Sequence, residues 1–223
     1  MLLDLSQVRF SRYDRRRGIT VPNKPSADLA EEVAIHLGDG YLFYDLKDRS
    51  YRYGIGLNPK KEQLYAEEVA SILEKLYGIR PRVYNARIEV MSLAIGTFKH
   101  LVLKFPIGSR NGTERLPYIN WVFSNEEFMI SFIRGLVDTE GSIKKLSRTI
   151  AVVIKMRNRK IIEALYTMIN RIGIKAKVYM WAERGKPIYA VIITGNTNVK
   201  DFIFLVKPRN KRIYSVKLLN CTY

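Results

Sequence analysis

The chain contains an internal duplication. The segment from Leu76 to Tyr84 (LYGIRPRVY) resembles the segment from Arg171 to Tyr179 (RIGIKAKVY), which lies 95 positions later. Upstream of them, Leu37 to Tyr41 (LGDGY) matches Asp138 to Ser142 (DTEGS) with an offset of 101. A repeat of this length that occurs only twice predicts a duplicated domain with pseudo-twofold symmetry, because a solenoid needs more stacked copies.

Both copies predict the same order of elements, α-β-β-α-β-β-α, which places the chain in the α+β class. In the first copy we expect a helix over 28–38, strands over 41–46 and 51–57, a helix over 61–77 and two strands within 82–92. In the second copy the expected ranges are 126–139, 142–146, 149–156, 159–172 and, for the last two strands, 177–194. A helical segment is expected to close each copy.

Local signals mark the ends of these helices. Gly78 and Gly173 are expected to end the helices before them, since glycine readily adopts the left-handed conformation found at helix ends. Asn125 is suited to cap the first helix of the second copy. We therefore expect three segments, namely a flexible basic arm over 1–26, an N-terminal half over 27–124 and a C-terminal half over 125–223.

The composition is that of a folded, strongly basic protein. Lys and Arg number 38 against 21 Asp and Glu, which gives a net charge of +17, and 47% of the residues are hydrophobic. This hydrophobic content excludes a disordered basic tail. A folded domain this basic is expected to bind a polyanion, with nucleic acid ahead of an anionic membrane.

Several classes of site are excluded by residue counts. The single cysteine, Cys221, excludes an internal disulfide and a cysteine-rich zinc site. The two histidines, His36 and His100, argue against a His-based zinc centre or a Ser-His-Asp triad. No run approaches the length of a membrane span, and the start lacks the features of a secretory signal. We expect an intracellular protein of the cytoplasm or nucleoid.

Small residues recur at every fourth position of the first helix in each copy: Ala30, Ala34 and Gly38, and then Ser131, Gly135 and Thr139. This spacing places them on one helical face, so the two helices are expected to cross with their backbones close together. Each helix then ends at an acid followed by glycine, namely Asp39 and Glu140. Carboxylates are disfavoured at a helix C-terminus, so a bound cation or a proton is expected there, and oxygen ligands make Mg²⁺ the suitable cation.

These segments carry a family resemblance. Ile133–Gly141 (IRGLVDTEG) resembles the LAGLIDADG motif, and Glu32–Gly40 (EVAIHLGDG) resembles a degenerate first copy. The chain is therefore similar to the monomeric, two-motif LAGLIDADG homing endonucleases over nearly all of its length after about residue 27. The resemblance implies two antiparallel four-stranded sheets that form a saddle for DNA. The chain departs from the motif at Leu37, where an earlier acid is usual, and at Glu140, which replaces aspartate.

The resemblance also implies roles for individual residues. The last acid of each motif binds the catalytic metal ions, which assigns that role to Asp39 and Glu140, together with the preceding residues Gly38 and Thr139. Mg²⁺ is the expected cofactor, Mn²⁺ is expected to substitute for it, and Ca²⁺ is expected to bind without supporting cleavage.

Further catalytic roles follow from segments beyond the motifs. Gly108-Ser109-Arg110 and Asn210-Lys211-Arg212 resemble the family's basic signatures, so Arg110 and Lys211 are expected to act as transition-state cations. Asn58 and Lys155 are the expected water-positioning residues.

Alternation along the strands sorts side chains to two faces of each sheet. In the strand near Thr149, the apolar face is expected to hold Ile150, Val152, Ile154 and Met156, and Ala176, Val178 and Met180 are expected to point inward. The expected DNA-binding residues are Arg80, Arg82 and Tyr84 in the first half and Lys144, Lys155, Arg157, Lys175, Lys177, Tyr179 and Trp181 in the second. Basic and aromatic groups of this kind suit phosphate contacts and base reading.

The function implied by this reading is site-specific hydrolysis of both strands of a long, largely non-palindromic double-stranded DNA. The protein is expected to act as a monomer without an obligate protein partner. An RNA-splicing maturase or a non-cleaving nucleic-acid-binding protein on the same scaffold remains an alternative. Loss of one motif acid would favour the maturase, and the chain keeps both acids. A regulator that only binds would usually add a helix-turn-helix domain, and the sequence shows no such pattern.

Overall fold

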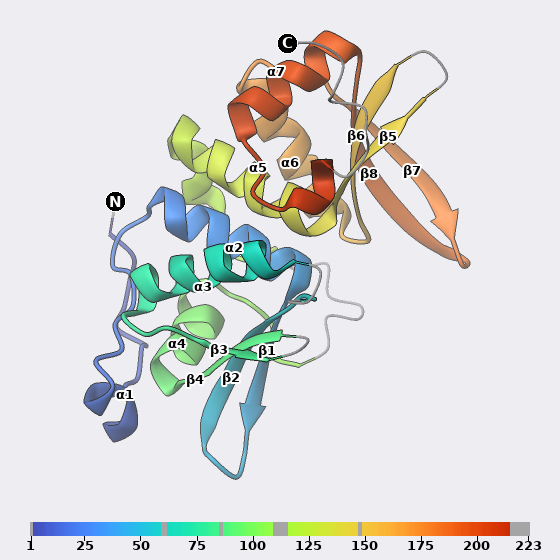
Figure 1. Ribbon diagram of the computed structural model, residues 1–223. Coiled ribbons are helices and arrows are strands. Elements are labelled where there is room, and N and C mark those ends of the chain that lie inside the picture. The colour runs from blue at the N-terminus through green and yellow to red at the C-terminus, as the bar shows by residue number, and fades with distance from the viewer. Residues whose placement is uncertain (1, 59–61, 85–86, 109–115, 147–148, 215–223) are drawn as a thin grey trace.

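The computed structural model describes residues 2–58, 62–84, 87–108, 116–146 and 149–214. Two similar halves lie one above the other, and each combines helices with one four-stranded antiparallel sheet (Figure 1). The strand order is β1-β2-β4-β3 in the first sheet and β5-β6-β8-β7 in the second. The expected α+β class and the two antiparallel sheets are thereby confirmed.

The elements of the first half are α2 (Ala27–Asp39), β1 (Gly40–Asp45), β2 (Ser50–Gly56), α3 (Gln63–Tyr77), β3 (Arg82–Tyr84), β4 (Arg87–Met91) and α4 (Leu93–Thr97), followed by a π-helical turn over Phe98–Val102. Those of the second half are α5 (Glu126–Glu140), β5 (Gly141–Lys145), β6 (Ile150–Met156), α6 (Arg159–Arg171), β7 (Lys177–Glu183), β8 (Lys186–Thr194) and α7 (Asn196–Val206). A 3-10 turn over Asn120–Ser124 joins the halves. The predicted order therefore holds in both copies, including the closing helices.

The helix ends form as the local signals predict. The Asn125 side chain accepts a hydrogen bond from the backbone N–H of Glu127 and so caps α5. Gly78 follows α3 in the left-handed conformation, with a φ of 68°, and Gly173 follows α6 with a φ of 83°. Lys104 and Lys207, which follow the closing helical segments of the two halves, are also left-handed, with φ values of 62° and 50°. The duplication thus extends to backbone conformation.

The N-terminal segment is packed against the first half, so the expected flexible arm is wrong. It contains α1 (Arg12–Arg16), and the buried Asp14 anchors it. The Asp14 carboxylate accepts hydrogen bonds from the backbone N–H groups of Ser11 at 2.9 Å and Ala94 at 3.2 Å. Ile19 joins the main hydrophobic core. The arginines of this segment favour a solvated arm. Its packing depends instead on one buried residue, Asp14, which the composition does not reveal.

The expectation for β7 is also corrected. The strand register places Val178 and Met180 on the same face as the buried Val191, as expected, but these two side chains are 40% and 65% exposed. The strand lies at the edge of its sheet, and its hairpin with β8 projects from the body of the protein (Figure 1). Both faces of its outer part therefore meet solvent. In β6, which β8 separates from β7, Ile150, Val152 and Ile154 are buried in the core as expected. No helix in the described ranges is long and apolar enough to span a membrane.

Candidate functional site

Helices α2 and α5 lie side by side at the centre of the molecule (Figure 1). Their contact leaves no room for larger side chains at two glycines. A Cβ atom on Gly135 would lie 2.5 Å from the backbone oxygen of Glu31 and 2.8 Å from the Cβ of Ala34. A Cβ atom on Gly38 would lie 2.1 Å from the hydroxyl oxygen of Thr139. The predicted close crossing of the two small-residue faces is confirmed.

This crossing brings the ends of the two motifs together. Asp39 and Glu140 are the last residues of α2 and α5, and each follows a member of the Gly38–Thr139 contact. The two acids, which are about a hundred positions apart in sequence, therefore lie at the same end of the crossed helix pair. Each helix passes directly into the first strand of its sheet, so the acids sit where the two halves and their sheets meet.

The donor chemistry at this point suits Mg²⁺. Asp39 and Glu140 supply carboxylate oxygens, and the last carbonyl groups of a helix supply further oxygen atoms. Over the described residues, no cluster of three or more His, Cys, Asp and Glu side chains is placed to hold a metal ion. A divalent ion here would therefore complete its coordination with backbone oxygens, water and phosphate oxygens, which is the usual environment of Mg²⁺.

The segment after α7 packs against the end of α5. The buried Asp138 carboxylate accepts hydrogen bonds from the backbone N–H groups of Arg209 at 2.9 Å and Asn210 at 3.0 Å. Burial raises the pKa of Asp138 to about 7, although these two N–H groups oppose the rise. The equivalent residue in the first copy is Leu37, which is also buried but apolar. The earlier acid of the second motif therefore holds the C-terminal segment in place.

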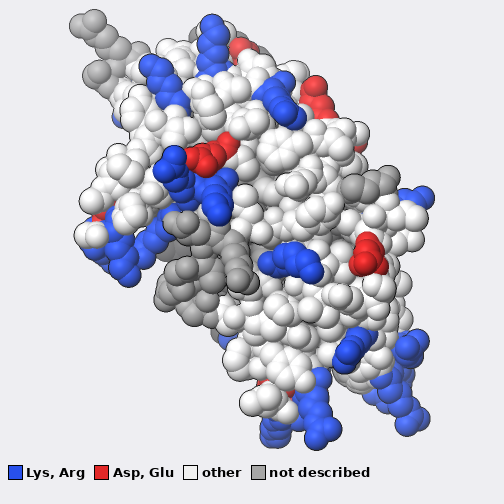
Figure 2. Space-filling view, turned by 180° about the vertical axis from the view of Figure 1, so that it is seen from behind, with Lys and Arg blue, Asp and Glu red and all other residues white. Residues whose placement is uncertain are grey.

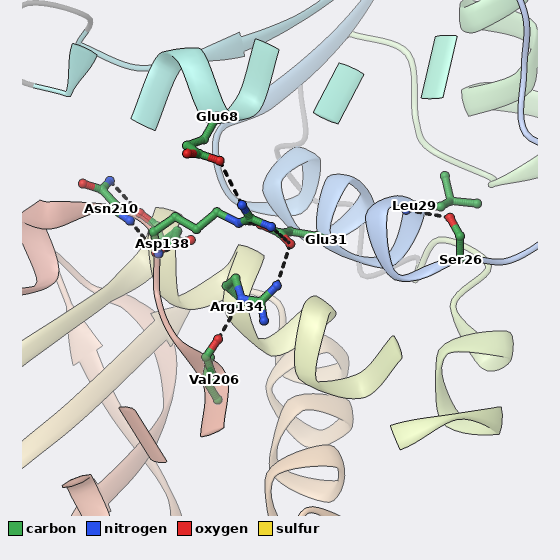
Figure 3. Close-up of polar contacts among 9 residues, drawn as sticks. Ser26, Leu29, Glu31, Glu68, Arg134, Asp138, Val206 and Asn210 are labelled. Atoms are coloured by element: carbon green, nitrogen blue, oxygen red, sulfur yellow. Dashed lines mark hydrogen bonds and ion pairs between the residues drawn. The ribbon is translucent and has the colours of Figure 1, made fainter. Parts of the chain in front are cut away.

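A buried ionic network joins the two halves next to this segment (Figure 3). Glu31 of α2, with a side chain only 1% exposed, contacts Arg134 of α5 at 2.9 Å and Arg209 at 2.6 Å. Arg134 also donates to the backbone oxygen of Val206, and Arg209 reaches Glu68 of α3 at 2.9 Å. One carboxylate of the first half thus binds two guanidinium groups of the second and links α2 to α5 and to the segment after α7.

We expect Arg209→Ala to lower the free energy of unfolding by about 1–3 kcal/mol, because it leaves the buried Glu31 with one cation and removes a link between the halves. The estimate lies below that for a fully buried pair because Arg209 is partly exposed. Urea unfolding measures the change. The matched control is Arg159→Ala, which breaks an exposed pair with Glu163 and should change stability by about 0.5 kcal/mol at most. Equal losses in the two variants would contradict this role.

The expected catalytic cations are placed as follows. Lys211 is exposed at the start of a 3-10 turn over Lys211–Tyr214, which lies beside β5, the strand that follows α5 directly. Its neighbour Arg212 makes the direct contact: it donates hydrogen bonds to the backbone oxygens of Thr139 at 2.8 Å and Asp138 at 3.3 Å. Arg110 lies outside the described residues. The Thr139 hydroxyl donates to the backbone oxygen of Gly135 at 2.9 Å, so the Thr139 side chain is held by its own helix.

The two expected water-positioning residues do not occupy equivalent positions in the two halves. The strand register pairs Gly40 with Ile55 in the first sheet and Gly141 with Ile154 in the second. Asn58 follows Ile55 by three residues, and the residue three after Ile154 is Arg157, not Lys155. Gly56, two residues before Asn58, lies beside the first motif, since a Cβ on it would be 3.5 Å from the backbone oxygen of Asp39. Lys155 instead pairs with Glu183 at 3.1 Å on the outer sheet face.

In the first sheet, the expected position of the Arg80 side chain on the sheet face is corrected. Its guanidinium pairs with Glu67 and Glu74 of α3, so it lies against that helix rather than on the sheet face. Arg82 and Tyr84 are exposed on β3, as a DNA-binding role requires. Arg80 precedes the strand, so strand alternation does not set the direction of its side chain.

The second sheet presents a different outer face. The expected basic and aromatic residues lie on or beside its strands and are exposed or partly exposed: Lys144, Lys155, Arg157, Lys175, Lys177, Tyr179 and Trp181. At the centre of this face, Ala151, Val153 and Ala190 form a small apolar cluster separate from the main core. In the view of Figure 2, Lys and Arg side chains are spread over the visible face, and one group lies at the left-hand edge, on the side where the second sheet projects in Figure 1. The combination offers cations for phosphate and small apolar groups for base methyls.

Several site residues were missed by sequence reasoning. Glu31, Arg134, Arg209 and Arg212 surround the motif ends, yet their partners lie 71 or more positions away. The only available signal was the presence of Glu31 within an otherwise apolar helix face, since a buried acid requires a partner.

Comparison with known proteins agrees with this architecture. A family model described as a LAGLIDADG-like domain matches residues 127–207. The homing endonuclease I-WcaI is 15% identical with a TM-score of 0.58, over 91% of this chain and 92% of that one. Mesophilic variants of the homing endonuclease I-DmoI are 18% identical with a TM-score of 0.55, over 81% and 94% of the two chains. For the LAGLIDADG homing endonuclease I-GzeII the values are 12% and 0.52, over 86% and 87%.

These identities are low, so the structural matches establish the fold, while the family model identifies the second motif and its surroundings. The resemblance first inferred from Ile133–Gly141 and Glu32–Gly40 is confirmed. The chain carries a LAGLIDADG-like domain in its second half and has, across both halves, the fold of the single-chain, two-motif LAGLIDADG homing endonucleases.

Proposed function

We propose that the protein is a metal-dependent endonuclease that hydrolyses both strands of a long, largely non-palindromic double-stranded DNA site. The observation that carries this proposal is the contact of Gly38 with Thr139, which places Asp39 and Glu140 at one end of the crossed helices. A protein that only binds DNA would have no need for two carboxylates at this point, where they repel phosphate and one another.

Asp39 and Glu140 would each hold a divalent ion for the cleavage of one strand. When bound, such ions supply a nucleophilic water and stabilise the charge on the scissile phosphate. The backbone oxygens of Gly38 and Thr139 would act beside the carboxylates. Arg212 would hold the last carbonyl groups of α5 in position, and the exposed Lys211 next to it would bring a cation to the phosphate.

The two halves would contact different DNA sequences. Their outer sheet faces carry different residues, with a basic rim in the second half and mixed charges in the first. Because site symmetry mirrors protein symmetry, two unlike halves on one chain favour a non-palindromic target and action as a monomer. No further protein partner is required by this arrangement.

Structural relatives support this proposal. I-DmoI has been solved in complex with DNA and Mn, and in complex with DNA and Ca. I-WcaI has been solved bound to its DNA recognition sequence. The matching folds make a DNA-binding saddle the natural use of the two sheets, and Mg²⁺ or Mn²⁺ the natural metals.

Cleavage of a random DNA library tests the proposal. In Mg²⁺ or Mn²⁺ we expect linear fragments that share one long asymmetric sequence, and in Ca²⁺ we expect the same sequence to be bound without being cut. The Ca²⁺ arm is the control, since it separates recognition from hydrolysis. Selective binding with no cleavage in Mg²⁺ or Mn²⁺ would assign the protein to a non-cleaving role on the same scaffold.

A further inference from the structure

The outer face of the first sheet contains an acid held by a tyrosine. Glu89 of β4, with a side chain only 11% exposed, accepts a hydrogen bond of 2.5 Å from the Tyr41 hydroxyl of β1. The strand register aligns Tyr41, Gly54 and Glu89 across three strands. The Tyr41 ring lies over Gly54, because a Cβ there would be 2.4 Å from the ring. Because Gly54 of β2 has no side chain, the Tyr41 side chain of β1 can pass over β2 and reach Glu89 of β4.

Two arginines meet the same carboxylate. Arg87 approaches Glu89 through its Nε atom at 3.3 Å, and Arg52 approaches it through a terminal nitrogen at 3.7 Å. Arg52 is also bound by Asp45 at 2.9 Å and by Asp48 at 3.4 Å. Its charge is therefore taken up by three carboxylates, whereas Arg87 has Glu89 as its acidic partner among the described residues.

This cluster is unsuited to holding phosphate. It places the carboxylates of Asp45, Asp48 and Glu89 against only two guanidinium groups, so it has no excess positive charge with which to attract the DNA backbone. Burial and the neighbouring Glu89 raise the pKa of Tyr41, so its hydroxyl stays protonated and continues to donate. The chemistry of the cluster is that of a fixed hydrogen-bonding array.

Arg87 is the member of the array that is best placed to reach a partner. Its guanidinium lies 5.0 Å from the centre of the Tyr84 ring, and its side chain is 49% exposed. Among the described residues, Arg87 contacts an acid only through Nε, so its two terminal nitrogens can meet another acceptor. Two terminal N–H groups of one arginine match the O6 and N7 acceptors of guanine in the major groove.

We propose that Arg87, held by Glu89 and Tyr41, reads one guanine of the DNA target. The proposal rests on the proposed function, in which the outer sheet faces contact DNA. Orientation by Glu89 and Tyr84 restricts the rotamers of Arg87 before binding, so less entropy is lost when the base contact forms. Glu89 and Tyr41 are positioning residues that act through Arg87.

Three substitutions test the proposal by binding of a randomised DNA library in Ca²⁺, with base preference measured at each position. Arg87→Lys keeps the charge but removes the two-pronged donor, so the guanine preference at one position should fall about tenfold. Glu89→Gln keeps the size but frees Arg87, and should weaken the same preference while raising affinity for unrelated DNA. Tyr41→Phe should weaken it less.

The matched control is Glu67→Gln, which removes the same charge where Glu67 pairs with Arg80 on α3. It should leave the preference at every position unchanged. If Arg87→Lys and Glu89→Gln leave every base preference as in the wild type, the proposal is wrong while the proposed function stands. If the wild type itself has no base preference, both are wrong. Thermal unfolding of each variant confirms that it is folded.

Discussion

We expect Asp39→Asn and Glu140→Gln each to abolish double-strand cleavage while leaving specific DNA binding largely intact. Each substitution keeps the size of the side chain and removes the negative charge that would hold a divalent ion at the end of α2 or α5. Loss of a single group that stabilises transition-state charge typically costs about 10²–10³-fold in rate. The sheet faces that would bind DNA are untouched, so affinity should change little.

Supercoiled plasmid that carries the selected target separates the two cleavage events, because a nick relaxes it and a double-strand break linearises it. If each acid serves one strand, a single variant should accumulate nicked plasmid and form linear product at least about 10²-fold more slowly. The double variant should form neither product. Binding is measured in parallel in Ca²⁺.

The chain offers matched controls at the opposite ends of the same helices. Asp28 and Glu126 lie in the first turns of α2 and α5, far along the helix from the motif acids. Asp28→Asn and Glu126→Gln make the same chemical changes and should leave cleavage within about twofold of the wild type, because helix-end charges contribute only fractions of a kcal/mol. Wild-type cleavage by Asp39→Asn or Glu140→Gln would show that the metal site lies elsewhere.

The parts of this fold that could be predicted from sequence are those encoded by neighbouring residues. Helix α5 was expected over 126–139 and is found over Glu126–Glu140, because Asn125 caps its start and glycine follows its end. The small-residue spacing also predicted the helix crossing, since the pattern occurs in both copies and each face needs a partner. The duplication strengthened this prediction, because the small-residue spacing and the terminal acid-glycine pair occur in both copies.

The parts that could not be predicted depend on contacts between distant segments. Arg209 binds Glu31 across 178 positions, and neither residue type nor spacing marks the pair in advance. Strand alternation places Arg80 on the sheet face, whereas its side chain pairs with two acids of α3, a contact that the sequence does not indicate. The arginine-rich composition of the N-terminal segment favours a flexible arm, whereas its packing depends on one buried carboxylate, that of Asp14. The motif acids could be predicted from the sequence, whereas the residues that contact the motif ends, such as Arg212, could not.

The second large effect is expected from a buried ion pair beneath α2. Lys99 and Glu32 are 0% and 1% exposed, and they form an ion pair while the Tyr53 hydroxyl donates to the same carboxylate. The Lys99 ammonium also lies 4.9 Å from the ring centres of Tyr53 and Phe105. Burial lowers the pKa of Lys99, and the Glu32 carboxylate opposes this shift. We expect Lys99→Met to lower the free energy of unfolding by about 3–5 kcal/mol, because Glu32 is left buried and uncompensated.

Urea unfolding of Lys99→Met, Glu32→Leu and the double variant measures the coupling between the two residues. The double variant should recover part of the loss, because an apolar pair avoids the cost of two desolvated charges while the buried Tyr53 hydroxyl loses its acceptor. A double variant as unstable as the sum of the single changes would contradict this account. Glu32 lies on the same helix as Asp39, so cleavage by the double variant carries separate information. Full stability with reduced cleavage would mean that the ion pair orients α2, and hence its terminal acid, beyond its effect on stability.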